Sequence, residues 1–402
     1  MDPLPTLRLK AGEDRRLRAG HLWIFSNEVD TGRTLLRAFA PGDPAVVEDA
    51  RGRPLGQAYV NPGSLICARL VSRDPAVGLD HATLVQRLRT ALRLRERLFP
   101  APYYRWVHAE ADGLPGLIID RFGDVCVVQP NTAGMDAVTD RLVEALERVA
   151  APSAILIRAD SPVRELEGLE RSVAWVGGDG PETLRVEENG LVFEVSAVGG
   201  QKTGWYYDQR ANRARLAAYT AGSRVLDAYS YAGGFAVAAA AAGAAEVVAV
   251  ERSAAACARI AANAEANGVG DRVTVVEGEV SPYLAAARAD GERFDVAVVD
   301  PPAFIKRKRD QRAGERAYRQ VNEGALRLLG KEGVLLTCSC SSHLPADRLA
   351  GLVLAAGRHL DRSPRILERG GPGPDHPVHP AIPETDYLKA LFIRSVMATA
   401  LP

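Results

Sequence analysis

Acidic residues and glycines follow short apolar runs in the second half of the chain, and each run is typical of a buried strand. The first run ends in Asp227 and leads to Gly233-Gly234. The next ends in Glu251, and a third ends near Glu279. Ligands of a doubly wound sheet bind beyond the carboxyl ends of its strands, and a glycine turn lets the backbone approach them closely. A carboxylate about twenty residues after such a turn can accept hydrogen bonds from two ribose hydroxyls, so these residues predict a nucleoside site.

The kind of nucleoside follows from what the glycine turn lacks. The GxGxxG fingerprint of pyrophosphate binding is absent. The carboxylates of Asp227 and Glu279 would repel a pyrophosphate, whereas they suit a nucleoside that carries no phosphate. We therefore expect S-adenosylmethionine as the cofactor. The alternatives are a dinucleotide and a glycine turn that only packs a helix.

A fourth apolar run ends in the segment Asp300-Pro301-Pro302-Ala303-Phe304. Two prolines directly after a strand stiffen the loop and fix where its first and last residues lie. A stiff loop with an aromatic residue suits the holding of a flat base at the place where a methyl group would be transferred. The alternative is a strand terminator without a further role.

The chain has five cysteines, an odd number without a CxxC pair, so neither a disulfide framework nor a zinc knuckle is expected. Cys67, Cys126 and Cys257 lie in apolar runs that favour burial. Cys338 and Cys340 stand two apart on a fifth strand-like run, so both point to the same face and their spacing does not choose between them. Cys340 is nearer the carboxyl edge, where a substrate would lie.

The elements that would position these residues alternate as strand and helix from Ser223 onward, which predicts a mostly parallel, doubly wound α/β sheet. A hairpin at 184–196, with Asn189-Gly190 as its turn, precedes them, and we assign residues 181–402 to this domain. Residues 1–72 show short apolar runs broken by Gly, Pro and Asn, typical of a small β-rich domain. Residues 73–180 mix helical and strand patterns, as a central α+β domain would.

The 402 residues are 47% hydrophobic, which is enough for several cores, and carry 50 basic and 50 acidic side chains. Any nucleic acid would therefore bind to local basic faces, since the net charge is zero. The N-terminal residues lack the apolar core of a signal peptide, and no run of about eighteen apolar residues follows. We expect a cytoplasmic protein with no membrane partner.

Several segments together resemble one known family: GQKTGWYYDQR (200–210), LDAYSYAGGF, DPPAF and LLTCSCSSH, behind ADGLPGLIIDRFGD. In this order they are similar to the bacterial large-subunit (23S) ribosomal RNA cytosine-C5 methyltransferases of the RlmI type. The resemblance covers essentially the whole chain. It implies a PUA-like RNA-binding domain, a central α+β domain and a Rossmann-like class I methyltransferase domain that forms 5-methylcytosine in ribosomal RNA. It also favours a homodimer.

The resemblance assigns a cofactor site made of Lys202, Tyr206, Asp227, Tyr229, Gly233, Gly234, Phe235, Glu251, Arg252, Glu279 and Asp300. The residues from Asp227 to Phe235 would surround the methionine half, Glu251 would bind the ribose and Glu279 would face the adenine. The GQKTGWYYDQR segment would close over the cofactor, with Lys202 paired to its carboxylate and Tyr206 packed beside it. From the residues alone, Lys202 is equally well a solvated loop lysine.

The resemblance also implies a covalent mechanism. Carbon five of cytosine is a poor nucleophile until a group adds to carbon six, and a thiolate is the natural reagent for that addition. Cys340 matches the family's Ser-Cys-Ser motif and is the predicted nucleophile, while Asp300 would hydrogen-bond the base. A related branch of RNA cytosine methyltransferases has a second cysteine where this chain has Pro302 and Ala303, so product release would work without it. The base that removes the proton from carbon five is not identified.

Two basic segments are candidates for RNA contacts. They contain Lys306, Arg307, Lys308 and Arg309 after the DPPAF motif, and Lys10, Arg15 and Arg16 in the first domain. Both suit the binding of phosphates around a cytosine that has left its helix, although a solvated helix start explains the first segment equally well. His376 and His379 are too isolated to predict a metal site.

Two other functions fit the same cofactor fold. An RNA guanine-N or small-molecule methyltransferase would need no cysteine, because a nitrogen nucleophile reacts directly. An RNA-binding assembly factor would hold the cofactor without turnover.

Overall fold

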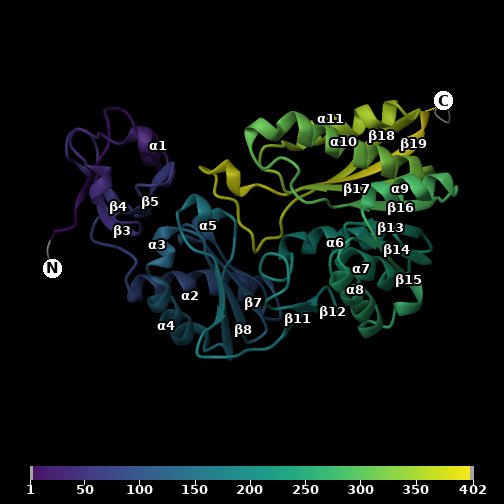
Figure 1. Cartoon of the computed structure of the whole chain (residues 1–402), viewed down its shortest axis with the longest axis horizontal. Helices are drawn as coiled ribbons and strands as arrows, with labels where there is room; N and C mark the ends of the chain where they lie inside the picture. The colour runs from purple at the N-terminus through teal and green to yellow at the C-terminus, as the bar shows by residue number, and fades with distance from the viewer. Residues whose placement is uncertain (1–2, 399–402) are drawn as a thin grey trace. The chain divides into compact units, whose positions relative to one another are not determined.

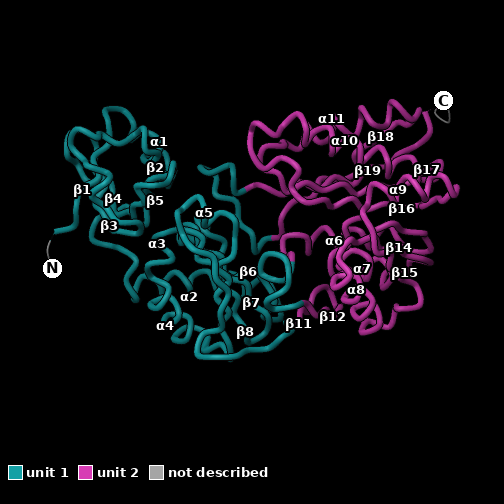
Figure 2. Tube along the Cα trace, in the orientation of Figure 1, with its two compact units in different colours: residues 1–184, 196–205, 374–385 teal, residues 185–195, 206–373, 386–402 magenta. Residues whose placement is uncertain are grey.

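The computed structural model describes residues 3–398, so the outer ends of the predicted domains, residues 1–2 and 399–402, lie outside the described part. The chain forms two compact units (Figure 2). Unit 1 comprises residues 1–184, 196–205 and 374–385, and unit 2 comprises residues 185–195, 206–373 and 386–402. Residues 181–184, 196–205 and 374–385 of the predicted methyltransferase domain therefore fold with unit 1.

The first sheet of unit 1 has five strands in the order β1-β3-β4-β5-β2 (Figure 1). β1 and β3 run parallel, and the other neighbours run antiparallel. Leu7, Ile24, Val47 and Ala68 are among the side chains of its core, and the small β-rich domain is confirmed. The elements are β1 (Thr6–Arg8), α1 (Arg15–Arg18), β2 (Trp23–Phe25), β3 (Asp43–Glu48), β4 (Pro54–Val60) and β5 (Ile66–Ser72).

The second sheet of unit 1 has the order β10-β9-β8-β7-β6 and is antiparallel except between β8 and β9. Helices α2 (His81–Leu98) and α4 (Thr139–Ala150) pack on it, because their apolar faces share a core with Trp106 and Val128. The other elements are β6 (Tyr103–His108), β7 (Leu117–Phe122), β8 (Val125–Pro130), α3 (Ala133–Asp136), β9 (Ala154–Ala159), α5 (Val163–Leu166) and β10 (Ser172–Trp175).

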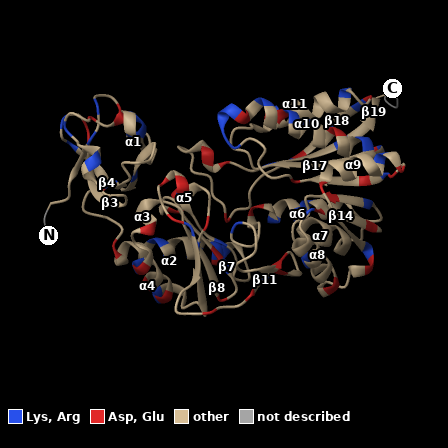
Figure 3. Cartoon of the chain, in the orientation of Figure 1, with Lys and Arg blue, Asp and Glu red and all other residues tan. Residues whose placement is uncertain are grey.

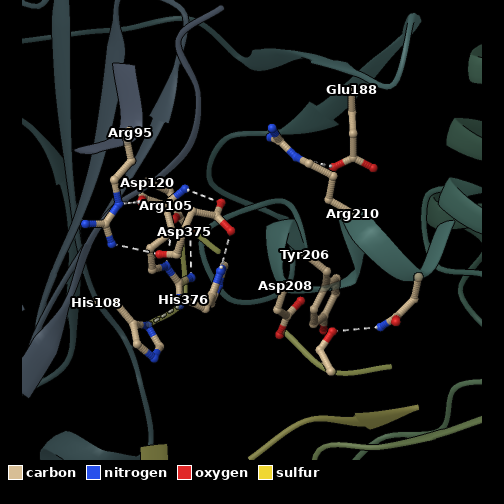
Figure 4. A network of polar contacts seen from close by, with 12 residues as sticks. Arg95, Arg105, His108, Asp120, Glu188, Tyr206, Asp208, Arg210, Asp375 and His376 are labelled. Carbon is tan, nitrogen blue, oxygen red and sulfur yellow. Dashed lines mark hydrogen bonds and ion pairs between the residues drawn. The ribbon is translucent and has the colours of Figure 1, made fainter. Parts of the chain in front are cut away.

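Arginines and carboxylates are buried as pairs in unit 1 (Figure 4). Arg95 forms an ion pair with Asp112 at 2.6 Å, and Arg105 forms one with Asp120 at 2.8 Å. The Asp375 carboxylate accepts the backbone N–H of Arg105 at 3.0 Å, and the Asp375 carbonyl accepts a hydrogen bond from Arg95 at 2.8 Å. The segment that carries Asp375 is thus tied to the second sheet by buried polar contacts.

A hairpin, β11 (Thr183–Glu188) and β12 (Leu191–Ser196), follows the second sheet in the chain. Both turn residues have positive φ, 52° at Asn189 and 81° at Gly190, as a type I′ turn requires. The predicted hairpin and its turn are therefore confirmed.

Unit 2 is built on a seven-stranded sheet with the order β15-β14-β13-β16-β17-β19-β18. The first five run parallel, and β19 runs antiparallel to both of its neighbours. The order reverses between β13 and β16, which is where sheets of this type bind their ligands. The strands are β13 (Arg224–Ala228), β14 (Glu246–Glu251), β15 (Val273–Glu277), β16 (Phe294–Val299), β17 (Leu329–Ser339), β18 (Arg362–Gly370) and β19 (Lys389–Met397).

Helices alternate with the parallel strands, as predicted for a doubly wound domain. Leu284, Leu326 and Val353 of α9, α10 and α11 share one core with Leu226 and Val299 of the sheet, whereas α7 packs against α6 and α8 (Figure 1). The helices are α6 (Arg210–Leu216), α7 (Gly234–Ala241), α8 (Ala254–Ala266), α9 (Val280–Ala289), α10 (Gln311–Leu328) and α11 (Ala346–Arg358).

Candidate active site

The loop between β13 and α7 has a backbone conformation that few side chains adopt. The φ angle is 68° at Tyr229, 52° at Tyr231 and 83° at Gly233. A residue other than glycine in this region costs on the order of 1–3 kcal/mol and persists only where its surroundings hold it, as at ligand sites. Gly234 and Phe235 begin α7 and are buried, and the Arg213 guanidinium lies 5.8 Å from the centre of the Phe235 ring.

Asp227, near the end of β13, holds this loop through one of its two carboxylate oxygens. Asp227 Oδ2 accepts hydrogen bonds from the Ser230 hydroxyl at 2.6 Å and from the Ala236 N–H at 3.0 Å. Its Oδ1 is buried and has no hydrogen-bond partner within residues 3–398. Burial raises the pKa of this carboxyl to about 6. A buried carboxylate oxygen that lacks a donor fits an ammonium group, which the methionine half of S-adenosylmethionine provides.

Glu251 ends β14 beside the same loop. Its Oε2 accepts the Tyr231 N–H at 3.1 Å, and its Oε1 accepts the Ser253 N–H at 2.9 Å. Each carboxylate oxygen can accept a second hydrogen bond. The carboxylate is thus fixed by backbone donors and retains acceptor capacity for two ribose hydroxyls.

Arg252 and Glu279 lie beside Glu251. The Gly278 N–H donates to the Glu251 carbonyl at 2.9 Å, which holds the end of β15 next to that of β14. Arg252 and Glu279 form an ion pair at 3.8 Å with 74% and 64% of their side chains exposed, so solvent weakens it. Their contacts with a cofactor stay predictions.

Asp300 follows β16 and is oriented by an amide for which the sequence predicts no individual role. Gln209 Nε2 donates to Asp300 Oδ2 at 2.9 Å. Asn212 of α6 donates to Gln209 Oε1 at 2.6 Å and to the Gly371 carbonyl at 3.1 Å. Because the Gln209 amide oxygen accepts the hydrogen bond from Asn212, the Gln209 amide nitrogen is the atom that donates to Asp300.

The rest of the Asp300 loop packs closely on α10. The Phe304 and Tyr318 rings lie 4.8 Å apart, and the Ile305 N–H donates to Ser341 Oγ at 3.2 Å. A Cβ at Gly314 would lie only 2.3 Å from the Ile305 side chain and 2.8 Å from the Phe304 carbonyl oxygen. The loop reaches this position because Gly314 has no side chain.

Cys340 directly follows β17, between two serines that share one partner. Ser339 Oγ donates to the Tyr318 hydroxyl at 2.9 Å, and that hydroxyl lies 2.9 Å from Ser341 Oγ. These bonds fix the residues on both sides of Cys340. Cys340 is partly exposed, whereas Cys338 is fully buried and its burial raises the thiol pKa well above the usual range. Cys340 is thus the accessible thiol of the two.

Lys389 begins β19 and pairs in register with Ser339 of β17. Its ammonium donates to the Ser341 carbonyl at 2.6 Å and to the Tyr387 carbonyl at 2.7 Å. Burial lowers the pKa of Lys389, and the side chain of Cys340 opposes that shift. Neither Lys389 nor Gln209 was predicted as a site residue. Lys389 lies in no motif. Gln209 lies in the GQKTGWYYDQR motif, but only Lys202 and Tyr206 of that motif were assigned to the site.

The two predicted lid residues belong to different units. Tyr206 is in unit 2, where its ring meets the Tyr231 ring edge-on at 5.4 Å, and burial raises its pKa well above the usual value. Lys202 is exposed and in unit 1, where its neighbour Thr203 donates a hydrogen bond to Asp120. Tyr206 therefore packs against the glycine loop, and the pairing of Lys202 with the cofactor stays a prediction.

The predicted RNA contacts differ in their surroundings. Lys306–Arg309 are exposed and precede α10, where Figure 3 shows basic residues gathered. Arg15 is also exposed, whereas Lys10 donates to the Asn27 carbonyl at 2.8 Å. Arg16 forms an ion pair with Glu28 at 2.6 Å, so it has a role inside its own domain.

Within residues 3–398, no group of three or more histidine, cysteine, aspartate or glutamate side chains is arranged to hold a metal ion. No helix of this part of the chain has the length and apolar character needed to cross a membrane.

Comparisons with known proteins identify the family. A family model described as S-adenosylmethionine-dependent methyltransferase matches residues 137–394, and one described as a PUA-like domain matches residues 7–73. A Cronobacter sakazakii protein named Ribosomal RNA large subunit methyltransferase I is 37% identical over 388 residues, which cover 95% of this chain and 97% of that protein. The Escherichia coli protein of the same name is 35% identical over 395 residues, with 96% and 98% covered.

Solved structures show the same fold. A methyltransferase complexed with SAH superposes with a TM-score of 0.84 at 21% identity, covering 97% of this chain and 100% of that one. A structure described as a SAM-dependent methyltransferase from Streptococcus mutans gives a TM-score of 0.82 at 21% identity, with the same coverage. With the family model and the curated relatives, these findings show that the chain belongs to the S-adenosylmethionine-dependent methyltransferases that include the proteins named Ribosomal RNA large subunit methyltransferase I, with S-adenosylmethionine as its cofactor.

Proposed function

We propose that this protein methylates carbon five of a cytosine in large-subunit ribosomal RNA, with Cys340 as a covalent catalyst. The names of the curated relatives supply the class of RNA. The observation that carries the chemistry is the Cys340 thiol, partly exposed at the carboxyl end of β17. Ser341 joins this position to the Asp300 loop through the Ile305 N–H. A nitrogen nucleophile would need no thiol at this position.

The Cys340 thiolate would add to carbon six, where an S–C bond forms and the electron pair of the C5–C6 double bond moves to carbon five and the conjugated ring. Carbon five is then nucleophilic. After carbon five has been methylated, loss of its proton returns the pair to the C5–C6 bond and Cys340 leaves as a thiolate. Asp300, oriented by Gln209, would hydrogen-bond the base and hold it above the thiol.

S-adenosylmethionine, when bound, supplies the methyl group. Asp227 Oδ1 would accept a hydrogen bond from its ammonium group, and Glu251 would accept its ribose hydroxyls. Tyr206 and Tyr231, whose rings pack edge-on, would shield this side of the site from water.

The RNA would be held through its phosphates by Lys306–Arg309 and by basic residues of the PUA-like domain, such as Arg15. The target cytosine would leave its helix, because a ring atom within a duplex cannot reach a buried site. The homodimer and the cytoplasmic location stay predictions.

The experiment that tests the covalent mechanism compares Cys340→Ala with Cys338→Ala. With radiolabelled S-adenosylmethionine and RNA from a strain lacking this gene, Cys340→Ala should reduce methyl transfer by a factor on the order of a thousand or more, as loss of a covalent nucleophile does. Cys338→Ala should keep most of the activity, because Cys338 is fully buried and exposes no thiol to the base. Full activity of Cys340→Ala would rule out the mechanism, and bisulfite sequencing of the large-subunit RNA would locate the 5-methylcytosine.

A further inference from the structure

Lys389 brings a buried positive charge to the end of the sheet where Cys340 lies. Its ammonium is held by the carbonyl of Ser341, the residue after Cys340, and by the carbonyl of Tyr387. Two of its three N–H groups are used in these bonds, which leaves one for a third acceptor. Lys389 is only 9% exposed, so the ammonium cannot rely on water to stabilise its charge.

Acidic and neutral groups face this place from the neighbouring elements. They are Asp208, Asp300, Asp386, Tyr206, Tyr318, Tyr387 and Cys338, and each acts on or contacts Cys340, Lys389 or their immediate neighbours. Burial raises the pKa of the neighbouring Cys338 thiol, and the charges of Asp300 and Asp208 raise it further, so carboxylates here oppose a thiolate. A thiolate at Cys340 therefore needs a cation nearby.

We propose that the Lys389 ammonium is the counter-ion that holds the Cys340 thiol in its thiolate form. The inference rests on the proposed function only in taking Cys340 as the nucleophile. Lys389 is a positioning residue: it makes no bond to the base, and it acts through the charge of Cys340. The stabilisation is mutual, because the thiolate adds an opposite charge beside the buried ammonium, on which the charge of Asp386 also acts.

The test follows the alkylation of Cys340 by iodoacetamide as a function of pH, with the Cys340 peptide quantified by mass spectrometry. Only the thiolate reacts, so the pH midpoint of the rate reports the thiol itself and needs neither RNA nor cofactor. In Lys389→Met the midpoint should rise by about one pH unit or more, as expected for the loss of an opposite charge. Lys389→Arg should keep the midpoint near that of the wild type.

Lys331→Met is the matched control, because Lys331 lies on β17 and is exposed. It should leave the midpoint unchanged. Circular dichroism verifies that each variant is folded. If Lys389→Met does not fold, the comparison of Lys389→Arg with Lys389→Gln decides: a midpoint that rises only in the glutamine variant supports the counter-ion. A midpoint that stays the same when the charge is removed overturns the proposal.

Methyl transfer provides a second readout. The rate of methyl transfer by Lys389→Met should be about tenfold lower than that of the wild type at pH 7. Above pH 9, where the Cys340 thiol ionises without a counter-ion, most of the rate should return. An equal loss at every pH would show that Lys389 only supports the backbone of Ser341 and Tyr387, and would overturn the proposal. The proposed function fails separately, through full activity of Cys340→Ala, and that result would leave the alkylation midpoint unaffected.

Discussion

Asp227 combines two tasks that conflict in a buried carboxyl group. Its Oδ2 must accept the donors that shape the glycine loop, which favours the ionised form, while its burial favours the neutral form. Burial dominates and raises the pKa to about 6. A bound ammonium would reverse that balance, so the empty and loaded forms of the site should differ in the charge of this carboxyl.

The stability of the protein should therefore fall between about pH 4 and pH 6 because of Asp227. The folded state holds the proton up to a pKa of about 6, whereas an exposed aspartate has a pKa of 3.8. The stabilising contribution of Asp227 to the free energy of unfolding is complete below pH 3.8 and is lost as the pH rises through 6. The difference between the two pKa values corresponds to about 3 kcal/mol. Urea unfolding of the wild type and of Asp227→Asn checks this from pH 4 to pH 7. A stability difference between them that does not change with pH would contradict it.

The positions of the candidate residues at the ends of strands could be predicted, whereas the positions of candidates fixed by long-range contacts could not. Asp227, Glu251 and Asp300 follow apolar runs, and a parallel sheet brings such residues to one edge. Gln209 and Lys389 reach the same edge from other parts of the chain, through an amide contact and a strand register. A local pattern contains no information about either contact.

At the scale of elements, the position of the Asp300 loop depends on how closely α10 approaches it. The loop packs against the helix at Gly314, and the hydroxyl of Tyr318, one turn further along α10, anchors the serines on both sides of Cys340. One helix therefore positions both the Asp300 loop and Cys340, the proposed nucleophile. A shift of α10 would displace both at once.

Gly314→Ala should destabilise the protein and reduce methyl transfer, and Gly351→Ala is its control. Both glycines lie within helices, where alanine is favoured by up to about 1 kcal/mol. At Gly351 the new Cβ meets nothing within 4 Å, so the change should stabilise. At Gly314 it collides with Ile305 and the Phe304 carbonyl, which costs about 1–3 kcal/mol. Thermal unfolding of the two variants measures the contrast, and equal melting temperatures would argue against the close packing.

Strand prediction succeeded in the parallel part of the sheet and missed β18 and β19. The parallel strands are apolar because helices cover both of their faces, and the Asn189-Gly190 turn signals its hairpin directly. β18 is largely polar and contains Pro364, which suits an edge strand but breaks the apolar pattern by which strands are found. The alternation of strand and helix therefore indicated the doubly wound class but not the two strands, β19 and β18, that complete the sheet with antiparallel pairing.

At the scale of the whole molecule, the chain leaves the methyltransferase unit twice and returns. Segments 196–205 and 374–385 fold with unit 1, where Thr203 binds Asp120 and Asp375 binds Arg105. The order of apolar patterns in the sequence predicts both segments to belong to the C-terminal domain. Membership of a unit depends here on individual buried polar contacts, and those contacts follow no periodicity.

Asp120→Asn should therefore weaken the attachment of both segments to unit 1, although Asp120 lies in neither segment. Arg105 and Asp120 are both buried, and a buried cation that loses its partner costs about 3–5 kcal/mol. Hydrogen exchange should become faster in segments 196–205 and 374–385, while the strands β13 to β17 of unit 2 keep their protection. Glu165→Gln is the control, because its pair with Arg171 at 2.8 Å is 42% and 66% exposed and contributes at most about 1 kcal/mol. Unchanged exchange in both segments of Asp120→Asn would mean that the buried pair does not hold them.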